Sequence, residues 1–238
     1  MDRANLKQTI WGLMLISALS SCAAVDTPKY KLSDDYFKTS AFKGESKKVY
    51  IDSSEDTIFV YRTDSRSSVL DTLTGKYDFP QITSQAEIKS AYFRQASLDL
   101  DFLTIPFKYR PTQSGLPQQF NTNLNGAVYL GRRDDIYHLS YRRTPLGKYQ
   151  RQISHYGISY GVFTGFGGSA MNPSVTNNHI SVEYDGLVWG KGVAGIIGIN
   201  NFTIGLAVGF DHLLDKNKKV WIYQGKPWLG LAFGLNLN

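Results

Sequence analysis

Two segments near the C-terminal end of the chain alternate strictly between bulky apolar residues and very small ones. In residues 202–210 and 229–237 the bulky positions are Phe202, Ile204, Leu206, Val208, Phe210, Leu229, Leu231, Phe233, Leu235 and Leu237. The positions between them are Thr203, Gly205, Ala207, Gly209, Gly230, Ala232, Gly234 and Asn236. A period of two predicts β-strands, because successive side chains of a strand point to opposite faces.

Neither face of these two segments carries a charge, and this bears on the kind of sheet they form. A soluble sheet with one solvated face has polar and charged side chains on that face. A transmembrane barrel has apolar side chains toward the lipid and small or polar ones toward its lumen. The pattern favours the transmembrane barrel. The alternative is a soluble barrel with the bulky face inward, which would bind an apolar ligand.

Further alternating segments begin at residue 97 and extend the barrel prediction upstream. They cover residues 98–109, 120–130, 136–141, 156–162 and 183–199, the last as one strand or two. The alternation slips by one residue near Phe102, which predicts a β-bulge, and Pro106 supports it because proline lacks a ladder donor. These segments amount to roughly six to eight strands. Since closed bacterial barrels have an even strand number, we expect an all-β, antiparallel up-and-down barrel of about eight strands, or ten if the hairpin within residues 48–62 joins the wall.

The N-terminal segment has the features of an export signal. Arg3 and Lys7 precede a short apolar stretch, which is too short to span a membrane and leads to Cys22. The sequence Leu19-Ser20-Ser21-Cys22 resembles the lipobox of bacterial lipoproteins, which implies cleavage before Cys22 and its acylation. The alternative is an ordinary signal peptide cut near Ala24. Cys22 is the only cysteine, so internal disulfides are excluded.

Between the signal and the barrel the sequence is more polar. We expect a signal peptide over residues 1–21, a lipid-anchored flexible tether over 22–47, an N-terminal hairpin region over 48–96 and the barrel over 97–238. The hairpin is expected within residues 48–62, with its turn at 53–56. A short helix is expected over Ala86–Tyr92.

Loop lengths suggest how the barrel is oriented. Asn200-Asn201 forms a two-residue turn, whereas residues 167–179 and 211–226 form long loops. Residues 97–238 resemble the outer-membrane β-barrel superfamily of Gram-negative bacteria, which has short periplasmic turns and long external loops. The resemblance implies a location in the cell outer membrane. We also expect interfacial aromatic residues at Trp189, Trp221, Tyr223 and Trp228.

The sequence contains little that indicates catalysis. It lacks a phosphate-binding loop, a dinucleotide fingerprint and a CxxC pair, and the four histidines are not spaced as metal ligands. We therefore expect no cofactor, no metal site and no enzymatic activity. A weaker alternative is an interfacial lipid hydrolase that uses His138 and Ser140, which share one face of a predicted strand. The net charge of +6 is spread along the chain, which argues against nucleic-acid binding.

The functional hypothesis is a lipid-anchored outer-membrane barrel with a structural or loop-mediated interaction role. Its expected partners are membrane lipids, and other envelope proteins or surface ligands bound through loops 167–179 and 211–226. The basic tip formed by Lys216, Lys218 and Lys219 is expected to be a solvated turn, with binding of anionic sugar or lipid as the alternative.

Overall fold

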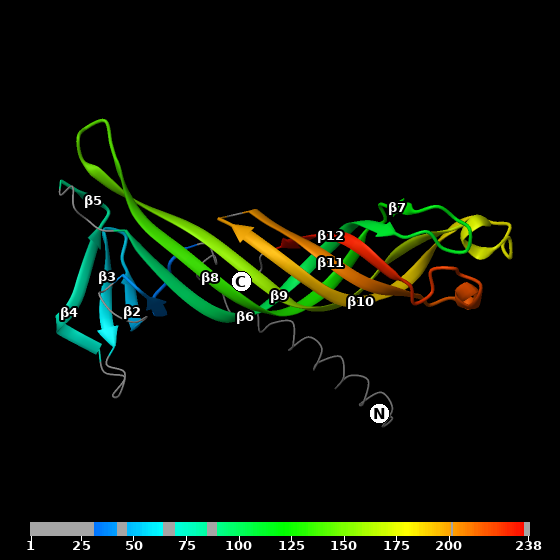
Figure 1. Ribbon diagram of the computed structural model, residues 1–238, viewed down its shortest axis with the longest axis horizontal. Coiled ribbons are helices and arrows are strands. Elements are labelled where there is room, and N and C mark those ends of the chain that lie inside the picture. The colour runs from blue at the N-terminus through cyan, green and yellow to red at the C-terminus, as the bar shows by residue number, and fades with distance from the viewer. Residues whose placement is uncertain (1–30, 42–46, 64–69, 85–89, 201, 236–238) are drawn as a thin grey trace, which may run out of the picture.

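The computed structural model describes residues 31–41, 47–63, 70–84, 90–200 and 202–235 (Figure 1). This part of the chain is all-β and antiparallel, as the alternation predicts, and its helical turns are η1 (Ser174–Thr176) and η2 (Lys216–Lys219). The strands are β1 (Asp35–Thr39), β2 (Lys47–Ser53), β3 (Thr57–Thr63), β4 (Leu70–Pro80), β5 (Ile82–Thr83), β6 (Ala91–Arg110), β7 (Gln119–Asn121), β8 (Asn125–Arg143), β9 (Tyr149–Met171), β10 (Tyr184–Ile199), β11 (Phe202–Leu213) and β12 (Pro227–Leu235).

Six strands form a closed ring. Their order is β6-β8-β9-β10-β11-β12, and β12 pairs antiparallel with β6 to complete the circuit. Each strand lies beside its neighbour in the chain, apart from the short β7, so the up-and-down arrangement is confirmed. The ring has fewer strands than the eight expected, because residues 125–143 and residues 184–199 each form one strand rather than two. Residues 119–121 form only a short strand beside β6.

The remaining strands extend the same sheet beyond β6, in the order β6-β1-β2-β3-β4, while β5 pairs with β9. Since only Gln81 separates β4 from β5, the sheet curls back on itself at this end. We call strands β1–β5, with the adjoining ends of β6, β8 and β9, the N-terminal sheet. The predicted hairpin within residues 48–62 is formed by β2 and β3.

The helix expected over Ala86–Tyr92 is not found where the chain is described. Residues 85–89 lie outside the described residues, and Ala91 and Tyr92 begin β6. Ala91 is buried in the core of the N-terminal sheet, whereas Tyr92 points outward and stacks on His138. Opposite faces for consecutive residues are the signature of a strand, and pairing with β8 outweighs any local helical preference.

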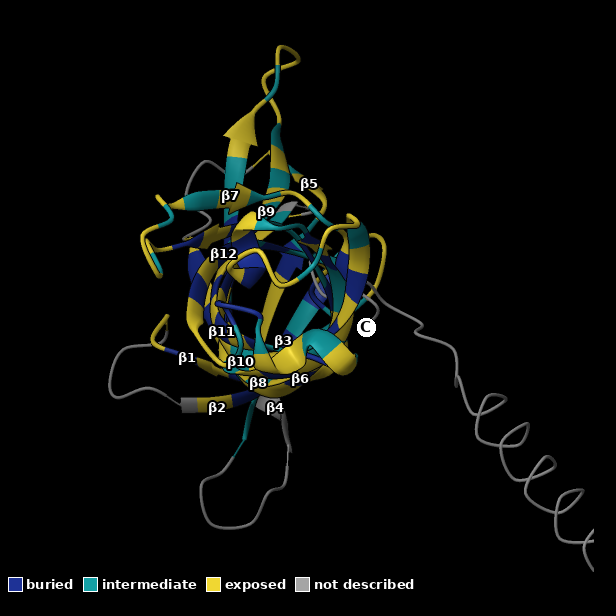
Figure 2. Cartoon of the chain, turned by 90° about the vertical axis from the view of Figure 1, so that its right-hand side faces the viewer, coloured by how far each residue is buried: buried dark blue, intermediate teal, exposed yellow. Residues whose placement is uncertain are grey.

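The polarity of the sheet reverses along the three long strands that the ring and the N-terminal sheet share. On β6, Phe93 is buried in an apolar core and Arg94 points outward, whereas farther along Asp99 is buried and Leu98 is 72% exposed. The core of the N-terminal sheet consists of Leu32, Phe37, Val49, Ile51, Ile58, Val60, Phe79, Ala91, Phe93, Tyr137 and Leu139. The N-terminal sheet is thus apolar inside, and the ring is apolar outside. Figure 2 shows the buried residues facing the inside of the ring and the exposed residues on its outside.

The outward face of the ring is covered by exposed apolar side chains, which we call the apolar belt. Its members are Leu98, Leu100, Phe102, Val128, Leu130, Tyr156, Ile158, Tyr160, Val162, Phe166, Leu187, Val193, Ile197, Ile199, Ile204, Leu206, Val208, Phe210 and Leu229. The small residues of β11 and β12, among them Ala207 and Ala232, face the interior. This distribution agrees with the faces expected from the sequence for a transmembrane barrel.

The expected bulge in β6 is present, but it lies at Ile105–Pro106 rather than near Phe102. Against β12, Phe107 pairs with Leu231 and Thr104 pairs with Phe233, so β6 has one extra residue between these pairs. The sequence misplaced the slip because Leu103 and Ile105 are apolar residues that face the interior. Pro106 cannot donate to the ladder and marks the true position.

Gly165 on β9 allows two strands of the ring to approach closely. A Cβ atom at this position would overlap the carbonyl oxygen of Gly126 and the backbone of Ala127 on β8. Gly126 itself faces open space, with nothing near a Cβ placed there. The two glycines therefore differ in what a side chain would meet.

We predict that Gly165→Val lowers the free energy of unfolding by about 1–3 kcal/mol, because the valine side chain overpacks against β8 and displaces its backbone. Gly126→Val is the matched control and should have a much smaller effect. Denaturant-dependent unfolding followed by tryptophan fluorescence measures both. Equal losses for the two variants would contradict the close approach of β8 and β9.

Candidate functional site

The interior of the ring is filled by side chains. The apolar part of the filling is Leu103, Ile105, Ala127, Tyr129, Phe163, Ala194, Ile196, Ala207, Trp228 and Ala232. Beside Lys108, Phe163 and Trp228 the remaining cavity measures about 10 Å³, roughly the space of one water molecule. This part of the interior therefore has no room for a small-molecule ligand.

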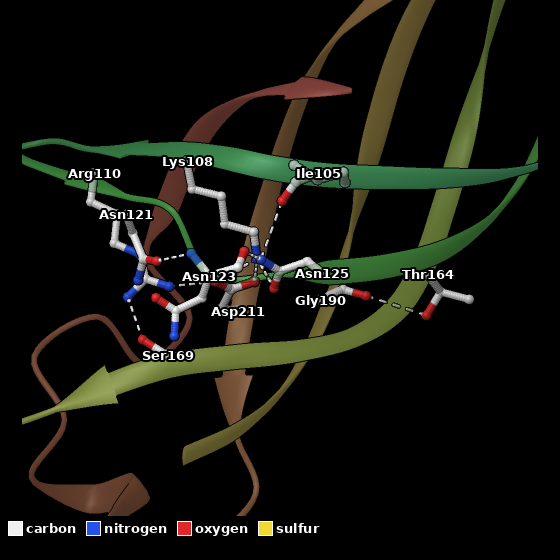
Figure 3. A network of polar contacts seen from close by, with 10 residues as sticks. All are labelled: Ile105, Lys108, Arg110, Asn121, Asn123, Asn125, Thr164, Ser169, Gly190 and Asp211. Carbon is white, nitrogen blue, oxygen red and sulfur yellow. Dashed lines mark hydrogen bonds and ion pairs between the residues drawn. The ribbon is translucent and has the colours of Figure 1, made fainter. Parts of the chain in front are cut away.

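Asp211 on β11 is the centre of a buried ion-pair cluster inside the ring (Figure 3). Its carboxylate accepts hydrogen bonds from Lys108 Nζ at 2.9 and 3.0 Å, and from Arg110 Nη2 at 2.6 Å. Lys108 also donates to Asn125 Oδ1 at 2.8 Å. Arg110 Nη1 donates to Ser169 Oγ at 3.2 Å. The cluster joins β6, β8, β9 and β11 across the interior.

Aromatic rings compensate for the excess of positive charge in this cluster. Two cations share one carboxylate, and the Nζ atom of Lys108 lies 4.4 Å from the centre of the Trp228 ring. The Arg110 guanidinium lies 5.0 Å from the ring centres of both Trp221 and Tyr223. Such cation–π contacts stabilise a charge that is withdrawn from water.

Trp221 and Tyr223 belong to a cap that closes the ring at the end of the long loops. They pack with Met171, Val175, Val188, Leu213 and Ile222 in a separate apolar cluster. Burial raises the pKa of the Tyr223 hydroxyl. The expectation of interfacial positions for Trp221, Tyr223 and Trp228 is wrong, because all three are buried against the cationic cluster. Trp189 is half-buried on the outward side and donates to Thr164 Oγ1.

A second buried cluster lies where the ring meets the N-terminal sheet. Asp135 Oδ1 accepts a hydrogen bond from Arg133 Nε at 2.8 Å and lies 2.6 Å from His155 Nε2. The His155 ring also packs against Tyr137, which belongs to the apolar core of the N-terminal sheet. This cluster holds β8 and β9 together at the level where the interior changes from polar to apolar.

Neither cluster was predicted from the sequence. The available signal was the parity of the charged residues: Asp99, Asp101, Arg133 and Asp135 lie on the inward face. Lys108 and Arg110 also face inward, but the bulge at Pro106 shifts their parity relative to Asp99 and hides the pattern.

The histidines considered at the sequence level do not converge. His138 and Ser140 do share the outward face of β8, and His138 stacks on Tyr92 with ring centres 4.3 Å apart. His179 Nδ1 lies 2.8 Å from the Thr176 carbonyl oxygen. Among the described residues, no group of three or more His, Cys, Asp or Glu side chains is arranged to hold a metal ion. Cys22, the predicted acylation site, lies outside the described residues.

The two long loops are shorter than predicted because β9 extends to Met171 and β11 extends to Leu213. The connections are residues 172–183 and 214–226, which lie at the same end of the ring (Figure 1). Between them is an open depression of about 830 Å³ lined by His179, Ile180, Ser181, Val182, Tyr184, Asp215, Lys216 and Asn217. Tyr184 donates to Asp215 Oδ2 at 2.6 Å and accepts from Asn217, which fixes one wall.

Comparison of the chain with protein-family models, curated proteins and solved structures finds no match. In the described residues, no helix has the length and apolar character needed to span a bilayer.

We predict that Asp211→Asn destabilises the fold by about 3–5 kcal/mol, because it leaves Lys108 and Arg110 buried without a counter-charge. Asp134→Asn is the control, since Asp134 is exposed and lies 4.0 Å from Arg132; its cost should stay below about 1 kcal/mol. Adding Lys108→Met to Asp211→Asn should recover part of the loss. The free energy of unfolding distinguishes these variants, and similar values for Asp211→Asn and Asp134→Asn would contradict the role of the cluster.

Proposed function

We propose that the protein is an integral β-barrel of the cell outer membrane, anchored in addition by acylation of Cys22, with a structural or loop-mediated interaction role. The observation that supports this proposal best is the apolar belt around a ring whose interior contains buried ion pairs. In a soluble protein this belt would expose a large contiguous apolar surface to water. In a bilayer the same surface faces hydrocarbon, and the closed ring leaves no unpaired strand edge.

The dimensions of the belt fit this proposal. On β9 the outward face has no charged residue over the eleven positions from Tyr156 to Phe166. On β10, Lys191 extends over the Trp189 ring at 4.6 Å. A tilted membrane strand needs about 9–11 residues to cross the hydrocarbon core. Lysine and tryptophan side by side are typical of the membrane–water interface.

The alternatives have less support. A soluble barrel that binds an apolar ligand requires the bulky faces of β11 and β12 to point inward, yet Leu206 is 58% exposed and Ala207 is buried. A lipid hydrolase requires His138 to activate Ser140, and the His138 ring is instead stacked on Tyr92. The filled interior argues against a pore, so interaction through loops 172–183 and 214–226 is the role that we favour.

We predict that Leu206→Arg destabilises the folded protein in lipid vesicles by about 2–4 kcal/mol of unfolding free energy. This is the cost of an arginine that faces lipid near the bilayer centre. Leu146→Arg is the matched control. Leu146 is 87% exposed in the connection between β8 and β9, at the end of the molecule away from the long loops. Its substitution should change the free energy by less than about 0.5 kcal/mol. Equal effects would mean that Leu206 faces water.

We predict that a Cys22→Ala variant with a standard cleavable signal remains in carbonate-washed membranes and changes its gel mobility on heating. Retention of the unsubstituted protein alone does not separate an acyl anchor from a spanning barrel, because acyl chains bind membranes by themselves. If the variant washes off as a soluble protein, the proposal of a membrane-spanning ring is wrong.

A further inference from the structure

A pocket of about 670 Å³ opens on the outer surface where β1 separates from β6. The two strands pair only through Lys38 with Arg94 and Thr39 with Phe93. The pocket is lined by four cationic residues, Lys38, Lys48, Arg94 and Arg132, together with residues of β1, β6 and β8. All four are exposed; among the described residues Lys38, Lys48 and Arg94 form no ion pair, whereas Arg132 lies 4.0 Å from Asp134.

Three of these cations form a row across neighbouring strands. Lys48 on β2 is directly opposite Lys38 on β1, and Lys38 is directly opposite Arg94 on β6. Like charges in directly opposed positions destabilise a sheet. Lys48 packs over the Tyr36 ring at 4.1 Å, and within the described residues Lys38 and Arg94 form no ion pair. The row is therefore costly unless an anion neutralises it.

The acidic residues of the pocket are occupied by other partners. Asp35 accepts hydrogen bonds from the Gln95 side chain and the Tyr36 amide. Asp134 lies 4.0 Å from Arg132, and Asp135 is buried in its cluster inside the ring. None of the three forms an ion pair with Lys38 or Arg94.

We propose that this pocket binds the phosphate group of an anionic phospholipid, in the leaflet next to the N-terminal sheet; this inference rests on the proposed membrane location. Arg132 on β8 is paired directly with Leu98 on β6, where the apolar belt begins. A phospholipid whose phosphate binds these cations thus has its acyl chains along Leu98, Leu100 and Leu130. A free anion would use only the cations, whereas a phospholipid uses the cations and the belt together.

The test is a titration of the full-length protein in neutral detergent with phosphatidylglycerol, with bound lipid measured by native mass spectrometry. Lys38→Gln/Arg94→Gln should bind about thirtyfold more weakly, since each basic residue at an anionic membrane surface contributes roughly a factor of five. Arg143→Gln/Lys148→Gln removes two exposed cations at the β8–β9 connection, outside the pocket, and should bind as the unsubstituted protein does. If the double variant does not fold, Lys38→Gln alone should bind about fivefold more weakly.

Three results would overturn the proposal. Equal affinities of the unsubstituted protein and the Lys38 variants would show that the cations do not bind the headgroup. If inorganic phosphate displaces the bound phospholipid and occupies the pocket to the same extent, the pocket binds a free anion rather than a phospholipid headgroup. Loss of the Cys22→Ala variant from carbonate-washed membranes would refute the membrane-spanning ring as well, whereas equal affinities with retention of that variant would refute only the headgroup site.

A stability measurement gives an independent readout. Without added lipid, Lys38→Gln/Arg94→Gln should have a melting temperature equal to or above that of the unsubstituted protein, because it relieves the opposed charges. A lower melting temperature would contradict the inference that Lys38 and Arg94 repel each other when no anion is bound.

Discussion

The pairing of β12 with β6 is the contact on which the rest of the structure depends. It closes the ring after six strands, so the interior is narrow and is filled by side chains. A narrow interior requires small residues on the inward face, and the bulky residues of the same strands consequently point outward. Ring closure therefore accounts for both the small inward residues and the outward apolar belt. On β11, for example, the small Ala207 is buried inside the ring, and the adjacent Leu206 is exposed on its outside.

The second organising feature is that strands β6, β8 and β9 continue from the ring into the N-terminal sheet. The backbone ladder is uninterrupted, yet the side chains change from apolar-outside to apolar-inside within a few residues. The cluster of Arg133, Asp135 and His155 lies inside at this level. The proposed headgroup pocket lies outside at the same boundary. If the ring spans a membrane, this reversal marks the bilayer surface on the side of the N-terminal sheet.

The sequence predicted the class of fold and the faces of its clearest strands because alternation with period two is a local signal. It failed where the signal was interrupted. The bulge at Pro106 changed the parity of β6. Charged residues on both faces, from Arg132 to Asp135, hid the continuity of β8 from Asn125 to Arg143. The cluster of Lys108, Arg110 and Asp211 was out of reach for a different reason. Its members are distant in the chain, and only the closed ring brings them together.

The most direct test of the account is the solvent accessibility of the outward face of β6 in lipid vesicles. Single spin labels would be placed through Arg94→Cys, Leu98→Cys, Leu100→Cys and Phe102→Cys in a Cys22→Ala background. We expect the labels at 98, 100 and 102 to be relaxed by lipid-soluble oxygen, and the label at 94 by a water-soluble nickel complex. Relaxation of all four labels by the water-soluble complex would contradict the account, because the apolar belt would then face water.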